Sequence, residues 1–407
     1  MTFLRKILVA TGLILVLALL RIFFQKYLPG PLIFHFNFFS CLQLIVMSWA
    51  VITGLLETLS RKYFTHRKSF LAFLLFLLLA ESGSYWMLHH PASIPRPFLP
   101  VSKYYYANYE RNVLQFDPNI AQYDTGLFYR MKSNNHTLFS NIEFADSIYT
   151  DALGFRDNTH ALDHPSIICL GDSYTLGWGV RQAEAYPSLL EATLGLPVLN
   201  TGMSSYGTAR EMASIEKVDK SSLRTVVIQY CYNDAGENDA WLHHDRRSFI
   251  SPPFAYDSAR KVLRWSQVWF PCKYSFTQLK IFLFKDLPVP AGKKSPVPIN
   301  EDTAPDNRQA AWFLEILKNS DLNFDSLNVF VFDIGEYTQL SGNFIDALEK
   351  KLADPAAKAT FKGHIHTLHV EKLLTPDDYY ILDDHIRPSG HRKLAKLLVD
   401  SIRNYER

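Results

Sequence analysis

Three long apolar stretches dominate the first ninety residues of the chain. They cover residues 7–24, 32–56 and 70–88, and each approaches the roughly 20 mostly apolar residues that a membrane-spanning helix needs. Arg5 and Lys6, which precede the first stretch, are also typical of a secretory signal peptide. Because no small-residue cleavage site follows and two further apolar stretches come next, we favour a membrane region with three spanning helices over residues 1–90.

Basic residues predict how these helices are oriented. The connection between the second and third stretches carries Arg61, Lys62, Arg67 and Lys68, and cytoplasmic loops are enriched in such residues. With three spans, the chain after about residue 89 is then expected outside the cytoplasmic membrane, on the periplasmic side. Glu81 lies inside the third stretch, where an acid indicates either a functional group or a hydrated helix end.

The remainder of the chain has the pattern of an α/β protein. Residues 91–164 are expected to form a proline-stiffened, extended linker and a small, partly β lead-in segment. From residue 165 to 407, short apolar runs alternate with stretches of helical spacing, which predicts a parallel sheet covered by helices on both faces. An insert at about residues 235–306 interrupts this alternation and is expected to pack as a cap or flap. The expected strands are 166–170, 197–199, 225–231, 328–332 and 366–370.

Composition narrows the possible partners. The 407 residues carry a net charge of +2, so electrostatics indicate no nucleic-acid partner. The four cysteines have no spacing typical of a zinc site or of a disulfide framework, and we expect them to be small buried hydrophobic residues. His364, His366 and His369 cluster near the last strand, but no matching Cys or acidic cluster accompanies them, so we predict no metal site.

Two polar segments carry candidate chemistry. A Gly-rich turn at residues 171–180 follows the first strand and contains Ser173. Residues at the carboxyl ends of parallel strands face a ligand crevice, and such a turn offers backbone N–H groups to an oxyanion. Serine needs a base, and His385 lies beside Asp383 and Asp384 in a loop before the last predicted helix. In isolation, Ser173 would more readily be interpreted as the cap of the helix that follows it.

Four short blocks together resemble the SGNH/GDSL hydrolase superfamily. They are Gly171-Asp172-Ser173, residues 200–207, Cys231-Tyr232-Asn233-Asp234 and Asp383-Asp384-His385, and they occur in the family's order. The match covers residues 166 to about 405, apart from the insert. Residues 153–157, which contain Arg156, are also similar to a lead-in found before the serine block in exported bacterial relatives. The resemblance implies a flavodoxin-like, three-layer α/β sandwich and requires neither a metal nor another cofactor.

The resemblance also implies roles for individual residues. Ser173 would be the nucleophile, His385 its base and Asp383 the acid that orients the base. The oxyanion hole would be formed by the N–H groups of Ser173 and Ser205 and by the side chain of Asn233. Ser205 stands where the family has glycine, and its N–H can still serve if the backbone avoids positive φ.

Two assignments remain open between neighbours. Asp384 also adjoins His385, although period-two alternation places Asp383 on the same side of the chain as the histidine. Asn238, in the segment 236–239, matches the third block more literally than Asn233 does. We prefer Asn233 because it directly follows the third predicted strand.

These residues favour a serine esterase that removes O-acyl groups, chiefly acetyl, from a glycan outside the cytoplasmic membrane. An O-acyltransferase of envelope polysaccharide would use the same triad, because both reactions pass through an acyl-enzyme. A lipid esterase or lysophospholipase is a third reading, since the helices would bring the chain to lipid. A non-catalytic glycan-binding domain is the alternative outside enzymes.

Overall fold

The computed structural model describes residues 3–27, 38–60, 63–157, 161–243, 252–284, 305–362 and 364–405. The chain divides into two compact units. The first comprises Met1–Arg111 and Asp257–Pro288, and the second comprises Asn112–Tyr256 and Val289–Arg407. The chain therefore returns to the first unit in the middle of the segment that the sequence marks as an insert.

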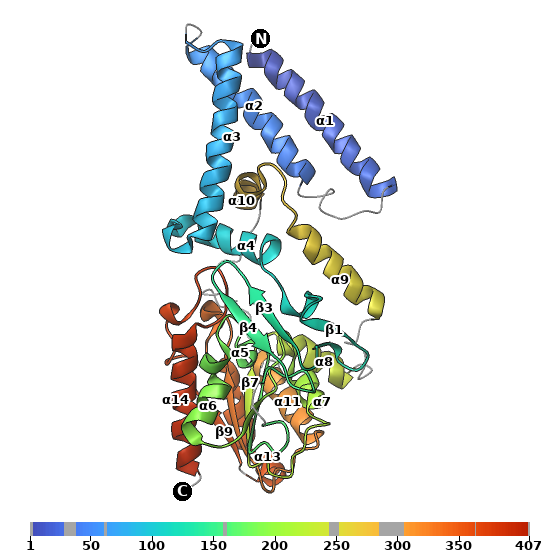
Figure 1. Cartoon of the computed structure of the whole chain (residues 1–407), viewed down its shortest axis with the longest axis vertical. Helices are drawn as coiled ribbons and strands as arrows, with labels where there is room; N and C mark the ends of the chain where they lie inside the picture. Colours follow the sequence, from blue (N-terminus) through green and yellow to red (C-terminus); the bar gives the residue numbers. More distant parts are fainter. Residues whose placement is uncertain are drawn as a thin grey trace. The chain divides into compact units, whose positions relative to one another are not determined.

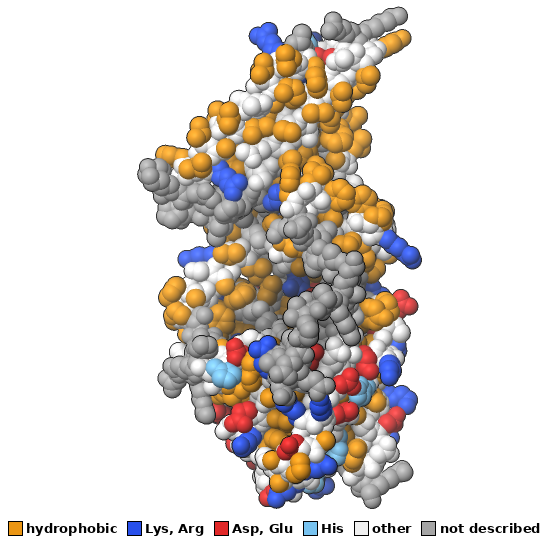
Figure 2. Space-filling view, turned by 180° about the vertical axis from the view of Figure 1, so that it is seen from behind, with side chains coloured by type: hydrophobic (Ala, Val, Ile, Leu, Met, Phe, Trp, Pro, Cys, Tyr) orange, Lys and Arg blue, Asp and Glu red, His pale blue; other side chains and the backbone are white. Residues whose placement is uncertain are grey.

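Three long helices form most of the first unit (Figure 1). They are α1 (Phe3–Tyr27), α2 (Phe39–Leu59) and α3 (His66–His89), and each has the length and hydropathy to cross a membrane. Residues 32–37 of the second predicted span lie outside the described residues. Many apolar side chains on these helices are exposed, and Figure 2 shows hydrophobic side chains over them, whereas charged side chains gather on the second unit. Lys6 of α1 donates to Glu57 of α2 at 2.6 Å and so joins the two helices.

Shorter helices complete the first unit. The sequence pattern predicts an extended segment after α3, and this prediction is wrong. The proline-rich segment instead folds into the 3-10 turns η2 (Pro91–Ser93) and η3 (Arg96–Phe98) and the helix α4 (Leu99–Tyr109). Proline is tolerated in the first turn of a helix, where its missing N–H costs nothing, and Pro100 occupies such a position in α4. From the insert, most of α9 (Pro253–Ser266) and all of α10 (Lys273–Phe284) belong to this unit.

A five-stranded parallel sheet is the centre of the second unit. Its strands are β5 (Ile167–Leu170), β6 (Val198–Asn200), β7 (Thr225–Tyr230), β8 (Asn328–Asp333) and β9 (Ile365–Leu368), in the spatial order β6-β5-β7-β8-β9. Counted along the chain this is the order 2-1-3-4-5 of flavodoxin-like sheets, which confirms the predicted fold class. All four strand pairs are parallel, and each strand lies within two residues of its predicted bounds.

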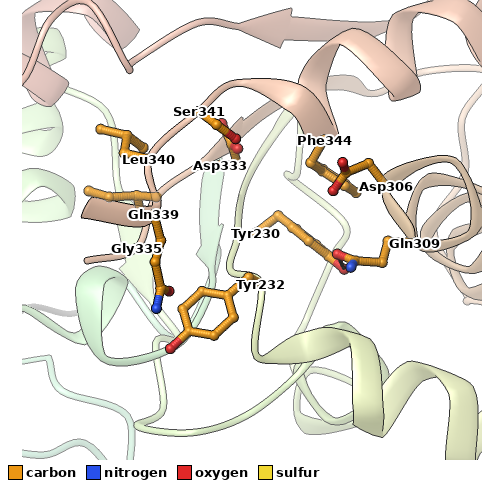
Figure 3. A pocket seen from close by; sticks show the side chains of 11 residues that line it. Tyr230, Tyr232, Asp306, Gln309, Asp333, Gly335, Gln339, Leu340, Ser341 and Phe344 are labelled. Atoms are coloured by element: carbon orange, nitrogen blue, oxygen red, sulfur yellow. Dashed lines mark hydrogen bonds between the residues drawn. The ribbon is translucent and has the colours of Figure 1, made fainter. Parts of the chain in front are cut away.

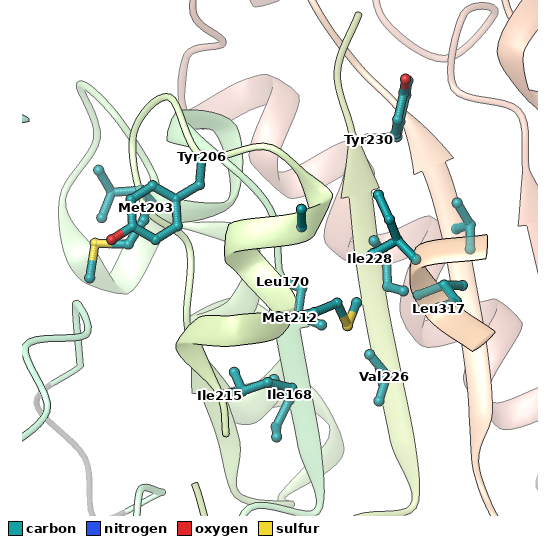
Figure 4. Close-up of a cluster of buried hydrophobic side chains, with 14 of the residues drawn as sticks. Ile168, Leu170, Met203, Tyr206, Met212, Ile215, Val226, Ile228, Tyr230 and Leu317 are labelled. Atoms are coloured by element: carbon teal, nitrogen blue, oxygen red, sulfur yellow. The ribbon is translucent and has the colours of Figure 1, made fainter. Parts of the chain in front are cut away.

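Alternate residues of each strand enter different cores. Ile168, Leu170, Val226 and Ile228 face a core completed by α7 (Thr208–Ser214), α11 (Pro305–Lys318) and α12 (Asn343–Leu352), part of which Figure 4 shows. Their strand neighbours, such as Val227, pack on the other face against α6 (Tyr186–Leu194) and α14 (Pro388–Tyr405). Burial on both faces explains why these strands are continuous apolar runs.

Two β-hairpins precede the sheet in the chain. The first pairs β1 (Ala121–Asp124) with β2 (Phe128–Met131), and the second pairs β3 (His136–Ser140) with β4 (Ala145–Tyr149). Phe139, Phe144 and Ile148 of the second hairpin are buried in the same core as Ile168 and Leu170. The partly β lead-in predicted from sequence is thus packed into the second unit.

Candidate active site

Ser173 begins a single helical turn at the carboxyl end of β5. This turn, α5 (Ser173–Leu176), is capped by Asp172, whose Oδ1 accepts a hydrogen bond from the N–H of Tyr174 at 3.0 Å. The turn ends at Gly177, in a left-handed conformation with φ of 82°. The sharp change from strand to turn holds Ser173 at the carboxyl end of the sheet, where its side chain is largely buried.

The second block lies directly against α5. Asn200, at the end of β6, accepts a hydrogen bond from the N–H of Gly202 at 3.0 Å. A Cβ atom at Gly202 would lie 2.2 Å from the backbone nitrogen of Leu176, so only glycine fits this position. The glycine therefore permits the turn after β6 to contact the turn that carries Ser173.

His385 connects Ser173 to two carboxylates. Its Nε2 lies 2.7 Å from Oγ of Ser173, and its Nδ1 lies 2.5 Å from Oδ1 of Asp383. Asp384 also approaches Nδ1, at 3.1 Å. Asp383 is fully buried and accepts a second hydrogen bond from the backbone N–H of His385, whereas Asp384 is about a third exposed. The closer and more buried carboxylate is thus that of Asp383.

Aromatic side chains fix the imidazole between them. The ring of Trp178 stacks on His385, with 4.8 Å between ring centroids and 18° between ring planes. The indole N–H of Trp178 also donates to Oδ2 of Asp383 at 3.3 Å. Tyr174 lies 4.9 Å from the imidazole and donates its hydroxyl to the backbone carbonyl of Asp384. Both aromatic residues come from the Gly-rich run around Ser173, although the sequence pattern gave them no role.

The carboxylates change the protonation of His385. Burial disfavours the imidazolium, but the charges and hydrogen bonds of Asp383 and Asp384 outweigh burial and raise the pKa of His385 to about 9. The site therefore stabilises the protonated base, which is the form that follows proton abstraction from a serine.

Backbone N–H groups are available beside Ser173. As the first residue of α5, Ser173 has an N–H that the helix itself does not use. The N–H of Ser205 has no hydrogen-bond acceptor in the described part of the chain. Its backbone, however, does not avoid positive φ as the sequence argument required: φ is 62°, so serine adopts the conformation that glycine favours. The tight turn after β6 imposes this conformation, at a cost of roughly 1–2 kcal/mol for a residue with a Cβ.

The two candidate asparagines differ in their surroundings. Asn233 follows β7, is exposed, and places its Nδ2 3.5 Å from Oδ2 of Asp172, next to the nucleophile. Asn238 is completely buried in α8 (Asp234–His243), where it bonds Thr208 and the N–H of Ala209. Asn238 therefore joins two helices, whereas Asn233 lies beside Asp172, the residue before Ser173.

Glu143 supports the loop that carries the base and was missed from the sequence. It lies in the turn between β3 and β4, with a side chain only 6% exposed. Its carboxylate accepts hydrogen bonds from three consecutive backbone N–H groups, those of Ile381 at 2.7 Å, Leu382 at 2.7 Å and Asp383 at 2.9 Å. Burial raises the pKa of Glu143 despite these bonds. No motif signals this role, because the two segments lie about 240 residues apart in sequence.

Arg156 supports the turn that carries Ser173. This buried guanidinium donates to the backbone carbonyls of Leu176 at 3.1 Å, Gly177 at 2.5 Å and Val180 at 2.8 Å. Carbonyls at the end of a helix have no partner within the helix, so an arginine here replaces water. Arg156 lies in the lead-in motif found from the sequence, and the structure gives that motif a physical function.

A pocket lies at the carboxyl ends of β7 and β8, beside the third block (Figure 3). Its cavity volume is about 90 Å³, and its walls include Tyr230, Tyr232, Asp306, Gln309 and Asp333. The hydroxyl of Tyr230 donates to the Gln309 side chain at 3.0 Å. Burial raises the pKa of Asp333 to about 6, and its Oδ1 has no hydrogen-bond partner among the described residues. The pocket thus presents tyrosine rings together with hydroxyl, amide and carboxyl groups.

Comparisons with known proteins find similarity only at the level of solved structures. No protein-family model matches the chain, and no curated protein sequence matches it. A protein described as lipolytic and of the G-D-S-L family, from Desulfitobacterium hafniense, is 12% identical over 57% of this chain and 97% of its own, with a TM-score of 0.31.

Two further structures are similar to the same extent. A structural-genomics protein from Lactobacillus plantarum is 11% identical over 60% of this chain and 98% of its own, with a TM-score of 0.32. Phospholipase A1 from Streptomyces albidoflavus is 15% identical over 58% of this chain and 97% of its own, with a TM-score of 0.26. The functional assignment therefore rests on the geometry of the site and not on these distant similarities.

Proposed function

We propose that the chain is a serine esterase of the SGNH type that removes O-acyl groups, chiefly acetyl, from a glycan outside the cytoplasmic membrane. The observation that carries this proposal is the continuous hydrogen-bonded series from Ser173 Oγ through His385 to Asp383, with contacts of 2.7 and 2.5 Å. Serine, imidazole and carboxylate in this order are the groups that acyl transfer through a covalent intermediate needs.

In the first half of the reaction, Oγ of Ser173 attacks the ester carbonyl while Nε2 of His385 takes the hydroxyl proton. The tetrahedral intermediate carries negative charge on the former carbonyl oxygen, which the N–H groups of Ser173 and Ser205 and the amide of Asn233 would stabilise. The intermediate collapses when the bond to the sugar oxygen breaks. His385 then returns its proton to that oxygen, which releases a sugar hydroxyl and leaves an acyl-serine.

In the second half, water attacks the acyl-serine. His385 removes a proton from the water and passes it to Oγ as the acyl–oxygen bond breaks, so that a carboxylic acid leaves and the serine is restored. Asp383 stays ionised and stabilises the imidazolium in both halves. Glu143 fixes the loop that carries His385, and Arg156 fixes the turn that carries Ser173, but neither side chain contacts the reacting atoms.

The glycan half of the substrate is supported by the pocket beside Tyr232. Sugar rings stack on aromatic side chains, and their hydroxyls form hydrogen bonds with carboxylates and amides. Tyr232, Gln309 and Asp333 offer these groups. A lipid chain would instead favour an apolar pocket. Asp333, which lines this pocket, is the carboxyl group that we assign to a sugar hydroxyl.

Acetate release from an O-acetylated polysaccharide tests this proposal, using the full-length chain in detergent. The wild type should release acetate and Ser173→Ala should not. Asp333→Asn should lower kcat/KM for the polysaccharide but leave hydrolysis of a small chromogenic acetyl ester unchanged. Fatty-acid release from lysophospholipid without acetate release would instead identify a lipid esterase. Transfer of acetyl to an added glycan in preference to water would identify an acyltransferase.

A further inference from the structure

Helix α10 of the insert packs within the unit that holds the three long helices. Phe276 and Thr277 on one side of α10 are buried, and Phe276 joins a cluster with Cys41 of α2 and with Phe270 and Cys272 just before α10. Leu77 of α3 packs against the same cluster. The chain therefore leaves the second unit to place a twelve-residue helix against α2 and α3.

Glu81 accepts the hydrogen bonds of N–H groups in the first turn of α10. Its carboxylate accepts hydrogen bonds from the N–H groups of Tyr274 at 3.2 Å and Ser275 at 2.9 Å, and from the Ser275 hydroxyl at 2.7 Å. These N–H groups are among those that a helix leaves unpaired at its first turn. Glu81 lies eight residues before the end of α3, or roughly 12 Å along its axis, which is inside the apolar segment. The acid is therefore a cap for α10 and not merely a hydrated helix end.

The other polar side chains along α10 also have partners within this unit. Lys273 is buried and donates to Glu110 at 3.0 Å, and Thr277 lies 3.6 Å from the Cys41 sulfur. Gln278 accepts a hydrogen bond from a serine of α4 at 3.1 Å. Lys280 lies 6.0 Å from the ring of Tyr109. Internal satisfaction of polar groups is what a hydrocarbon environment requires, because no water is present to replace a missing partner.

The remaining face of α10 is apolar and exposed. Leu279, Phe282 and Leu283, at the helical spacing i, i+3 and i+4, are 38%, 55% and 52% exposed. Phe282 lies 6.0 Å from Phe98, which is also exposed. Helix α3, against which α10 packs, also carries exposed apolar side chains, among them Leu74, Leu75 and Leu78. An apolar patch of this kind is unfavourable in water and marks an interaction surface.

We propose that α10 is a half-membrane helix, embedded at the end of the bilayer where α3 leaves it, with Leu279, Phe282 and Leu283 in contact with lipid acyl chains. Twelve residues rise only about 18 Å, too short to cross a hydrocarbon core of about 30 Å but suited to a re-entrant or interfacial segment. The helix faces lipid on one side and α2 and α3 on the other, which accounts for its apolar character on both sides.

Fluorescence quenching in proteoliposomes tests the proposal. Leu279→Cys, Phe282→Cys and Leu283→Cys of the full-length chain are each labelled with an environment-sensitive maleimide. Leu15→Cys, on an exposed position of α1, serves as the lipid control, and Lys396→Cys, on an exposed position of α14, serves as the water control. The four native cysteines are buried, so the unsubstituted protein gives the labelling background. Size-exclusion profiles in detergent confirm that each variant is folded.

Labels on α10 should lose fluorescence with doxyl-labelled phospholipid as strongly as the label on α1, and should resist aqueous iodide. Quenching by iodide but not by doxyl lipid would overturn the proposal. Protection from both quenchers would also overturn it, since a protein surface, such as a second copy of the chain, would then cover this face. If the Leu15 label were itself quenched by iodide and not by doxyl lipid, the membrane assignment of the long helices would fail as well.

Discussion

At the scale of single residues, the main feature of the site is a histidine that faces two carboxylates. A general base acts only in its neutral form, and the carboxylates of Asp383 and Asp384 raise the pKa of His385 to about 9. Below that pH the imidazole is mostly protonated. Esterase activity, measured as kcat/KM, should therefore rise with pH through about 9.

Replacing each carboxylate separately should distinguish their roles. Asp384→Asn removes one of the two charges that favour the imidazolium, so the rise in kcat/KM should move to lower pH while activity at high pH is retained. Asp383→Asn should lower kcat on the order of 10⁴-fold, because the imidazole loses the partner that orients it. A pH–rate profile of each variant provides the measurement. The reverse pattern, with Asp384→Asn inactive and Asp383→Asn active, would exchange the two assignments.

Asn233 and Asn238 form a matched pair for testing the oxyanion hole. Asn233→Ala should lower kcat by roughly 10²–10³-fold with little change in stability, since this is the usual effect of removing one oxyanion donor. Asn238→Ala should instead reduce the free energy of unfolding by about 1–3 kcal/mol, because it leaves buried partners on α7 unpaired. Kinetics and thermal unfolding of both variants decide the point. Loss of kcat confined to Asn238→Ala would show that Asn238, and not Asn233, is the donor.

The residues that the sequence could identify are those within short motifs. Ser173, His385 and their acidic neighbours stand in local patterns that follow strands, and the structure brings them within hydrogen-bond distance. The left-handed backbone of Ser205 was not foreseen, because a residue type alone does not fix φ in a turn. Glu143 could not be found either, since it accepts its hydrogen bonds from backbone N–H groups of a loop that is distant in sequence.

At the scale of elements, the β3–β4 hairpin stabilises the loop at residues 381–387, which carries His385, and we call this contact the brace. Its tip contributes Glu143, and its strands contribute Phe139 to the packing around Trp178, at 4.8 Å between ring centroids. Trp178 in turn stacks on His385. The hairpin therefore contacts the loop that carries His385 through hydrogen bonds, and it also packs against Trp178, which stacks on His385.

Glu143→Gln tests whether this brace positions the triad. The amide can accept fewer of the three hydrogen bonds, so the loop should loosen and kcat should fall by up to about 10²-fold with KM nearly unchanged. Weaker contact between Asp383 and His385 should also lower the pKa of the base and move the pH profile toward acid. Glu143→Asp should recover part of the activity. Asp146→Asn, which removes the same charge from the same hairpin, serves as the control.

A purely structural role for Glu143 predicts a different result. Thermal stability would fall, but the pH profile of the remaining folded enzyme would match that of the wild type. That outcome would contradict the positioning role.

The predicted strands agree with the structure because they are buried on both faces and therefore carry an unbroken apolar signal. Strands β5 and β7, for example, begin and end within one residue of the predicted ranges. The segment after α3 was wrongly expected to be extended, because prolines at first-turn positions are compatible with helix. Helix α10 shows why the insert was hard to interpret. One of its apolar sides packs against α2 and α3 and the other faces lipid, and hydrophobic periodicity alone cannot distinguish these two environments.

At the scale of the whole molecule, the chain passes between its two units three times. It leaves the first unit after Arg111, returns at Asp257 and leaves again after Pro288. The two units are therefore joined by three connections rather than by a single linker.

Basic residues predict the sidedness of the molecule. Because Arg61 and Lys62 follow α2 and Arg67 and Lys68 lie in the first turn of α3, the carboxyl-terminal unit should be outside the cytoplasm. An alkaline phosphatase reporter, which is active only after export, should be active when fused after Arg407. Activity only from a reporter that requires the cytoplasm would reverse the topology. Replacing these four basic residues with serine provides the matched control and should reduce export.

The central claim is that Ser173 is a nucleophile activated by His385, and covalent labelling by a fluorophosphonate probe tests it most directly. The full-length wild type should be labelled at one site, Ser173→Ala should not be labelled, and His385→Ala should be labelled far more slowly. The double variant should be little worse than either single variant in acetyl-ester hydrolysis, because the two residues act as a unit. Undiminished labelling of Ser173→Ala, or full hydrolysis by His385→Ala, would contradict the esterase assignment and favour a non-catalytic glycan-binding domain.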